Sequence, residues 1–443
     1  MAETGQTSLK TRFTNLKSDI HSFGDLFVGD RILWIVFFLL SAISLVSVYS
    51  SSILVTTGGF EGSVFLLIKQ FGMLLVGTII TVSVALTTVY GTPGLFKGKM
   101  VFVYIIALIL LLLTFIPGFR IEINGAARWI NFFGLTIQPS EFAKLALILY
   151  LSEFLTKDSP RNYLQEDSSD AKIFIGKVIL IVGLVMLLIV FSNFSTALFI
   201  AFIAFVMLVL ARIKFKKMLV LLSIVGALGA VMFILILTCP EPASKVFPRL
   251  HTWHTRIVSY LPSLEDEVVS ADTKVTSVDN YQVTQAKKAI KNGGLLGQGP
   301  GRSLQRHKLS QAYCDFIYAI IIEEYGWVGA ILVILLYLTL LVRVPMIQSK
   351  SKYLFDTMVV YGLTIMMVSQ AFIHMCVVVN VLPATGQTLP IISAGGSSLF
   401  ITCIEFGLII GICEYTKRKT ESKTNQKEEK VIIKNIVANE SIN

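Results

Sequence analysis

The chain has 443 residues, of which 54% are hydrophobic, and its mean hydropathy is +0.73. A soluble domain of this length is normally less apolar, so the composition excludes an ordinary soluble protein and indicates an integral membrane protein. The net charge of +10 does not point to nucleic acid, because no basic patch with interleaved aromatic residues is present. Basic residues near the ends of the apolar segments explain the sign, and we exclude nucleic acid as a partner.

A membrane helix needs roughly 20 mainly apolar residues, and such windows recur about ten times along the chain. We therefore expect an all-α polytopic membrane protein with about ten transmembrane helices. A long extracytoplasmic loop, about 240–314, should separate the seventh helix from the eighth. The expected spans are 32–53, 64–90, 101–116, 138–155, 173–191, 196–210, 218–238, 316–342, 354–381 and 391–415.

Lys and Arg residues flank these spans at alternate ends, and such residues favour the cytoplasmic side. They predict that both termini are cytoplasmic and that the 240–314 loop faces outward. Residues 1–31 form a cytoplasmic segment without a cleavage site, so we interpret the first span as a retained signal anchor. Residues 32–415 form the transmembrane domain, and residues 416–443, rich in Lys, Glu, Asn and Ser, form a flexible cytoplasmic tail.

Charged residues stand at the mouth of the fourth span, in the rows Gly125–Ile130 and Gln138–Lys144. At the centre of a membrane helix each charge would cost about 2.5–3.5 kcal/mol, so Arg128, Glu141 and Lys144 lie near the interface, pair with another group or serve a function. Glu141 and Lys144 are three residues apart on a helix, so an internal ion pair is the alternative to a functional role. Two further lone charges inside spans are Lys69 and Glu405.

The long polar loop carries a second group of signals. Residues Tyr281–Lys291 are typical of a short amphipathic helix on the membrane surface, which Gly293 and Gly294 would end. The glycines at 297, 299 and 301 resemble a phosphate loop, but no strand precedes them, so a dinucleotide site is excluded. We interpret them as positions where backbone approaches a substrate. Asp315 precedes a long apolar run, as a helix N-cap residue does.

The five cysteines show no CxxC pair and no metal-ligand spacing with His, so we expect no structural metal. Cys239 and Cys314 bracket the outer loop, where they form either a disulfide or two thiols packed at helix ends. His374, in the ninth span, is interpreted as a buried core residue rather than a ligand.

Four segments of the chain occur in a familiar order. They are Gly125–Ile130 with Gln138–Lys144; Tyr281–Gln285 leading to Gly293–Gly299; Asp315–Ala319 with Glu323–Gly326; and Leu382–Gly386 followed by Thr388–Ser398. On these segments, with ten expected spans and a long outer loop, the chain resembles the SEDS family, the FtsW/RodA/SpoVE group of peptidoglycan glycosyltransferases.

The resemblance implies polymerisation of lipid II, an undecaprenyl-diphosphate-linked disaccharide peptide, on the outer face of the cytoplasmic (inner) membrane. Asp315 matches the family's aspartate and is the expected general base, with the helix cap as its alternative role. Arg128 and Lys144 are expected near the diphosphate. A divalent cation such as Mg²⁺ or Mn²⁺ stays open as a cofactor. The other expected substrate-binding residues are Gln138, Ser140, Glu141, Gln285, Gly297, Gly299, Ser393, Gly395, Gly396 and Ser397.

Within the family, Gly299–Ser303 and Thr385–Pro390 favour the division branch, FtsW, over the elongation branch, RodA. The chain departs from the family pattern at Leu309–Cys314, where Leu-Pro-Glu-Ala-His-Thr is usual. The division branch implies a class B penicillin-binding protein transpeptidase and other divisome proteins as partners. Two classes of function stay open beside this one: a lipid II flippase or transporter, and a non-catalytic divisome scaffold.

Overall fold

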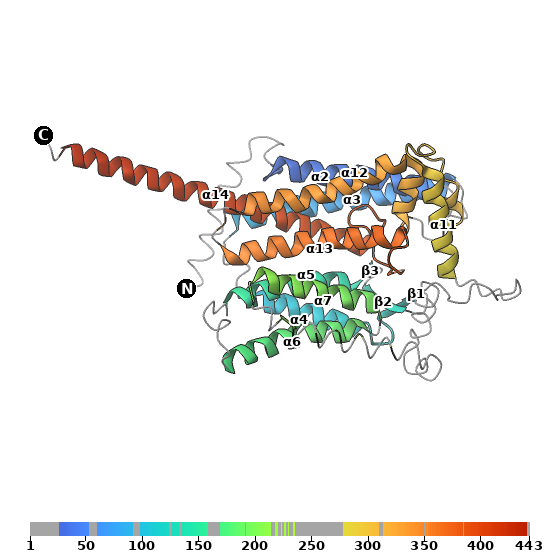
Figure 1. Ribbon diagram of the computed structural model, residues 1–443, viewed down its shortest axis with the longest axis horizontal. Coiled ribbons are helices and arrows are strands. Elements are labelled where there is room, and N and C mark those ends of the chain that lie inside the picture. The colour runs from blue at the N-terminus through green and yellow to red at the C-terminus, as the bar shows by residue number, and fades with distance from the viewer. Residues whose placement is uncertain are drawn as a thin grey trace, which may run out of the picture.

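The structure is a computed structural model that describes residues 26–52, 60–91, 98–123, 126–132, 135–157, 169–190, 192–213, 278–309, 313–349, 353–383 and 385–440, together with 218, 219, 223, 226, 229, 234 and 351. Its long helices run side by side in one bundle (Figure 1). Three short strands and α11 lie at one end of the bundle, and α14 projects from the other end. The elements are α2 (Arg31–Ser52), α3 (Phe60–Tyr90), α4 (Met100–Leu113), β1 (Arg120–Ile123), β2 (Ala126–Phe132), β3 (Leu135–Ile137), α5 (Pro139–Lys157), α6 (Ser169–Val190), α7 (Phe194–Leu210), α11 (Val278–Gly293), η2 (Gln305–His307), α12 (Ile317–Gln348), α13 (Leu354–Val378) and α14 (Gly396–Glu440).

Hydropathy located most of these helices. Within the described residues, six helices are long and apolar enough to cross a membrane, and α4 and α7 are shorter apolar helices of the same bundle. The first six predicted spans correspond to α2 to α7, and the eighth and ninth correspond to α12 and α13, with ends shifted by a few residues. The predicted polytopic helical architecture is therefore confirmed, while the seventh span, 218–238, lies largely outside the described residues.

The tenth span begins later than predicted. Hydropathy placed its start at Ile391, but α14 begins at Gly396, because residues 391–395 form turns rather than helix. Ile391 has a φ of +65°, a left-handed conformation that is unusual for a β-branched residue and cannot belong to an α-helix. The helix then continues to Glu440, past residue 415. The flexibility predicted for the tail stays a prediction.

The sequence analysis missed a small antiparallel sheet between α4 and α5. β1 pairs with β2 and β2 pairs with β3, so the sheet order follows the chain. The strands cover the row that contains Arg128, which the sequence analysis interpreted only as the mouth of a span. The all-α expectation therefore has one exception, and it lies at the end of the bundle that carries α11 (Figure 1).

Two helices form the centre of the bundle. The apolar windows of α13 and α14 are 67% and 72% buried, whereas that of α3 is only 28% buried. The number of neighbouring helices explains the difference: α13 packs against α5, α7, α12 and α14, and α14 packs against α3, α5, α12 and α13, whereas α3 packs mainly against α2 and α14. Polar side chains on α13 and α14 are consequently enclosed by protein rather than by lipid, where they need partners.

The glycine-rich segment after α11 is hydrogen-bonded to a kink in α12. α11 ends at Gly293, as predicted, and Gly294 follows with a φ of +53°. Gly326 interrupts the helical backbone of α12 with a φ of +65°. The kink leaves backbone carbonyls of α12 without helical partners, and the glycine-rich segment supplies them. The amides of Gln298 and Gly299 donate to the carbonyls of Glu323 and Glu324, each at 2.9 Å. The glycines thus let two backbones approach each other.

This contact predicts that Gly297→Ala destabilises the protein. Gly297 has a φ of +81°, and a Cβ there would overlap the carbonyl of Glu324. Gly294→Ala is the matched control, because Gly294 also has a positive φ but has open space around its Cβ position. We expect a clearly lower apparent Tm in detergent for the first variant than for the second, measured by differential scanning fluorimetry. Equal losses would mean that backbone strain, and not the packing of the two backbones, is what matters here.

Candidate functional site

Asp315 lies in the turn that leads into α12, the helix against which α11 packs. The N-cap position of α12 is held by Phe316, without a side-chain capping bond, and Asp315 precedes it by one residue. The Asp315 side chain is half-buried. The alternative role predicted for Asp315 was the N-cap of this helix. In the structure the N-cap residue is its neighbour, Phe316.

The Asp315 turn is joined to the loop before α14 by three hydrogen bonds. The Ala394 amide donates to the Tyr313 carbonyl at 2.9 Å. The Ser393 hydroxyl donates to the Cys314 carbonyl at 2.7 Å, and the Cys314 thiol donates to the Ala394 carbonyl. Two segments that are about 80 residues apart in the chain therefore fix the position of the Asp315 backbone together.

The neighbours of Asp315 in this turn stay neutral at physiological pH. Burial raises the pKa of the Cys314 thiol well above its usual value, and the negative charge of Asp315 raises it further. Burial also raises the pKa of Tyr313, with smaller contributions from Cys314 and Asp315. Neither side chain therefore competes with Asp315 as an acceptor of a proton.

The loop before α14, residues 385–395, is itself held by side chains of three helices. Non-helical backbone buried in a membrane protein has to find its hydrogen bonds within the protein. Here α2, α12 and α13 each supply a donor, and the strained Ile391 lies among them. The donors and their acceptor carbonyls are Ser44 and Ile392 (2.9 Å), Tyr337 and Pro390, and Gln370 and Thr388 (3.1 Å).

The predicted pair of Glu141 and Lys144 forms an internal ion pair. Their side chains meet at 2.8 Å, and the Lys144 side chain is only 1% exposed. The Lys144 ammonium also donates to the Gln370 side-chain oxygen at 2.6 Å. Glu405 of α14 is buried and within electrostatic range of both charges. Glu141 and Lys144 thus form the internal ion pair that was the alternative to a functional role. A diphosphate contact by Lys144 stays a prediction.

Arg128 lies on β2 and faces the same loop. Its Nε donates to the Ser192 carbonyl at 3.2 Å. A Cβ on Gly386 would lie 3.2 Å from the Arg128 guanidinium, and Gly386 has a φ of +66°. The loop therefore needs glycine at this position both for its backbone conformation and for the close approach of Arg128.

The first and last sequence motifs also meet directly. The Gln138 amide donates to the Ser397 hydroxyl at 3.1 Å, and the Gln138 side chain donates to the Ser140 hydroxyl at 3.2 Å. Gly395 and Gly396 lead into the first turn of α14 at this point. Most of the predicted site residues thus gather around the 385–395 loop and the first turn of α14.

Three predicted residues lie apart from this group, on or after α11. Gln285 is buried, and its side-chain oxygen has no hydrogen-bond partner among the described residues. Gly297 and Gly299 lie against the kink of α12. The structure gives these glycines a packing role, and their contact with a substrate stays a prediction.

Sequence reasoning missed the polar residues that hold the site from within the bundle, namely Ser44, Tyr337 and Gln370. A polar side chain inside an apolar span was the signal that could have found Gln370, since such residues need partners in protein. Its partners, however, are 18 and 226 residues away in the chain. No spacing rule identifies contacts of that kind.

The described residues contain no group of three or more His, Cys, Asp or Glu side chains that could hold a metal ion. The site described above is made of one carboxylate in a turn, an internal ion pair and exposed or half-exposed basic residues.

Long apolar helices around a charged end with a tightly bonded loop define a polytopic membrane protein. The chain belongs to the FtsW/RodA/SpoVE family, described as cell cycle proteins, whose pattern matches residues 30–418. One relative, the probable peptidoglycan glycosyltransferase FtsW of Legionella pneumophila, is 31% identical over 84% of this chain and 87% of its own length. Stage V sporulation protein E of Bacillus subtilis is 30% identical over 88% of this chain and 98% of its own length.

Solved structures share this fold. The rod shape determining protein RodA of Thermus thermophilus is 22% identical and aligns with a TM-score of 0.57 over 88% of this chain and 98% of its own. A second structure is a chain of a peptidoglycan synthase complex, described for its structural coordination of polymerization and crosslinking. It is also 22% identical and aligns with a TM-score of 0.62 over 87% of this chain and 98% of its own. At this identity the two structures establish the fold alone.

The buried ion pair generates a stability prediction. Lys144→Met leaves the buried Glu141 carboxylate without its cation, which typically costs about 3–5 kcal/mol, whereas removing both charges is often close to neutral. We expect a lower apparent Tm in detergent for Lys144→Met than for the double variant Glu141→Gln/Lys144→Met.

Lys157→Met on the same helix is the control, because Lys157 is exposed. It should leave the apparent Tm unchanged. A single variant that is as stable as the double variant would show that the Glu141 carboxylate does not depend on Lys144.

Proposed function

We propose that this protein is a peptidoglycan glycosyltransferase that polymerises lipid II on the outer face of the cytoplasmic membrane, in septal cell-wall synthesis. The observation that carries the proposal is the Asp315 turn, whose backbone is fixed by hydrogen bonds to a strained loop and whose aspartate side chain is half-buried. The chain also matches, over most of its length, relatives named peptidoglycan glycosyltransferase. The proposal rests on this combination of a fixed turn that carries a carboxylate and the names of relatives.

In this reaction a sugar hydroxyl of one lipid-linked disaccharide attacks the anomeric carbon of another. A new glycosidic C–O bond forms, the bond from the anomeric carbon to the diphosphate oxygen breaks, and the diphosphate departs with the electron pair. The hydroxyl proton passes to the carboxylate of Asp315, which acts as the general base. Because Cys314 and Tyr313 stay neutral, the carboxylate is the basic group of this turn.

The departing diphosphate needs a cation close to Asp315, and Lys69 of α3 is suited to this task. Lys69 is exposed, unlike Lys144. Met73 lies one helical turn after Lys69, and its sulfur is 4.0 Å from the position that a Cβ would take on Gly396. Residues four apart share one helix face, so Lys69 and Met73 both face the start of α14. The charge of Lys69 also acts on the Asp315 turn. Burial and Asp315 raise the pKa of Cys314, and Lys69 lowers it by a smaller amount.

Arg128 is the second candidate cation for a diphosphate. It reaches the opposite part of the 385–395 loop, beside Gly386. Two lipid-linked substrates each carry a diphosphate, and an arginine and a lysine beside different parts of this loop and the first turn of α14 suit two such groups. Lys144 then acts from within the bundle by positioning Gln370 and, through it, the loop.

The partner and the cellular role complete the proposal. A structural neighbour comes from a peptidoglycan synthase complex that couples polymerization to crosslinking. We infer a class B penicillin-binding transpeptidase as partner, together with other divisome proteins, and both termini in the cytoplasm. The names of the relatives favour the division branch over the elongation branch.

The decisive variant is Asp315→Asn. Asparagine keeps the shape of the side chain but cannot accept the proton, so polymerisation of labelled lipid II should fall about 10²–10⁴-fold. The assay uses the purified protein with its transpeptidase partner, and the partner must lack polymerase activity of its own. Glycan chain length and rate are read by gel electrophoresis.

Asp356→Asn, in the first turn of α13, is the control and should retain full activity. A normal rate for a folded, partner-bound Asp315→Asn variant would exclude Asp315 as the base. Polymer from neither the native chain nor the variant, with both folded and bound, would favour a transporter or a scaffold instead.

Lys69 is tested separately from the base. Lys69→Gln removes a charge-assisted contact worth about 1.5–3 kcal/mol, so kcat/KM for lipid II should fall about 10–100-fold. Lys69→Arg should recover most of the rate because it keeps the charge. Lys157→Gln is the matched control on α5. A Lys69→Gln variant with unchanged kcat/KM would exclude a diphosphate contact by Lys69.

A further inference from the structure

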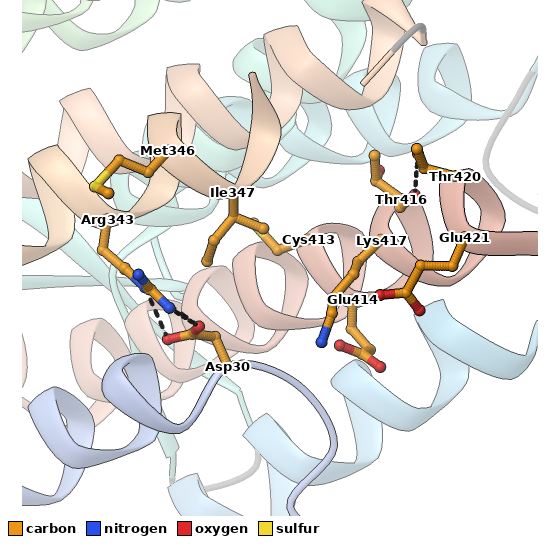
Figure 2. Close-up of a pocket in the computed structure, with 10 residues that line it drawn as sticks. All are labelled: Asp30, Arg343, Met346, Ile347, Cys413, Glu414, Thr416, Lys417, Thr420 and Glu421. Atoms are coloured by element: carbon orange, nitrogen blue, oxygen red, sulfur yellow. Dashed lines mark hydrogen bonds and ion pairs between the residues drawn. The ribbon is translucent and has the colours of Figure 1, made fainter. Parts of the chain in front are cut away.

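A cavity of about 540 Å³ lies between the residue before α2, the last turns of α12 and the middle of α14. It is far from the Asp315 turn, because Asp315 is at the start of α12 and this cavity is at its end. Small-molecule sites typically measure about 300–1,000 Å³, so the cavity is large enough for a ligand. Figure 2 shows its lining side chains.

One side of the cavity is a fixed ion pair. The Arg343 guanidinium donates to both carboxylate oxygens of Asp30, with a shortest distance of 2.6 Å. Burial raises the pKa of Asp30, but the hydrogen bonds and charge of Arg343 outweigh it, so the pKa is below its usual value. Both charges are therefore present at neutral pH.

The other side of the cavity is α14, which contributes Glu414, Lys417 and Glu421 (Figure 2). Glu414 is paired with Arg418 at 2.7 Å. Lys417 is exposed, and no ion pair joins it to a carboxylate in the described part of the chain. A cation and an anion one turn apart, Lys417 and Glu421, are thus available to a ligand with charges of both signs.

The remaining wall is apolar, with one buried hydroxyl. Met346, Ile347 and Cys413 line the cavity beside the charged residues. Thr416 is only 1% exposed, and its hydroxyl has no hydrogen-bond partner among the described residues. A buried hydroxyl normally has a partner, so this one is suited to a polar atom of a ligand.

We propose that this cavity binds a membrane phospholipid whose headgroup carries both a phosphate and a primary ammonium, as phosphatidylethanolamine does. The phosphate lies by Lys417, the ammonium by Glu421, and the first part of an acyl chain lies along Met346 and Ile347. The cavity is at the end of membrane-spanning helices, the depth at which headgroups lie. A bound lipid would hold the ends of α2, α12 and α14 together.

The charge balance selects this headgroup over others. The lining contains three carboxylates and two cations, which disfavours a headgroup with only negative charge. An ammonium with three N–H donors can hydrogen-bond to a carboxylate, whereas a quaternary choline cannot. The expected order of affinity is therefore phosphatidylethanolamine first, with phosphatidylcholine and phosphatidylglycerol weaker.

Native mass spectrometry of the full chain in detergent, titrated with each of the three lipids, tests the proposal. We expect phosphatidylethanolamine to bind at least about fivefold more tightly than the other two. Lys417→Gln and Glu421→Gln should each weaken it about threefold, in the range of an exposed charge pair. Lys157→Gln, outside the cavity, should leave binding unchanged.

Three outcomes would overturn the proposal. Equal affinity for the three lipids, or unchanged binding by both α14 variants, would show that the cavity does not select this headgroup. Soluble phosphoethanolamine is the second arm: it has the charges without the acyl chains, and displacement of the lipid at equal concentration would assign the cavity to a free ligand. Both arms are independent of glycan polymerisation.

Discussion

The 385–395 loop depends on one physical constraint: backbone that is neither helix nor sheet, buried among membrane helices, must satisfy its hydrogen bonds within the protein. Its carbonyls accept from Ser44, Tyr337 and Gln370, which come from three helices. This bonding allows Ile391 to keep a left-handed conformation that costs energy by itself. The hydrogen bonds from the centre of the bundle therefore hold the strained residue in place.

The position of the Asp315 turn follows from the same constraint. Ser393 connects the loop to the turn, because its hydroxyl both accepts from the Leu389 amide and donates to the Cys314 carbonyl. A change at Gln370 would thus be transmitted through the loop to the turn, although the two do not touch. The buried pair of Glu141 and Lys144 belongs to this support, because Lys144 holds Gln370.

Hydropathy and helix-end rules predicted α2 to α7, α12 and α13 and the end of α11, because these depend on residues close in the chain. The same rules failed at the start of α14, where apolar residues 391–395 form turns, and at β1–β3. Both failures involve partners from distant segments. For the candidate site, motif order singled out Asp315 and Arg128, whose roles stay predictions, but the ion-pair state of Lys144 and the packing role of Gly297 required the three-dimensional contacts.

Burial divides the basic residues near the site into two kinds. A cation that is already paired and enclosed, as Lys144 is, gains little from a second anion and cannot follow a leaving group. A cation on the surface beside the turn, as Lys69 is, loses less hydration when a diphosphate arrives and can release it afterwards. In the proposed reaction a diphosphate is bound and released in every cycle, so exposed cations would suit the substrate and the buried cation would suit the support of the Asp315 turn.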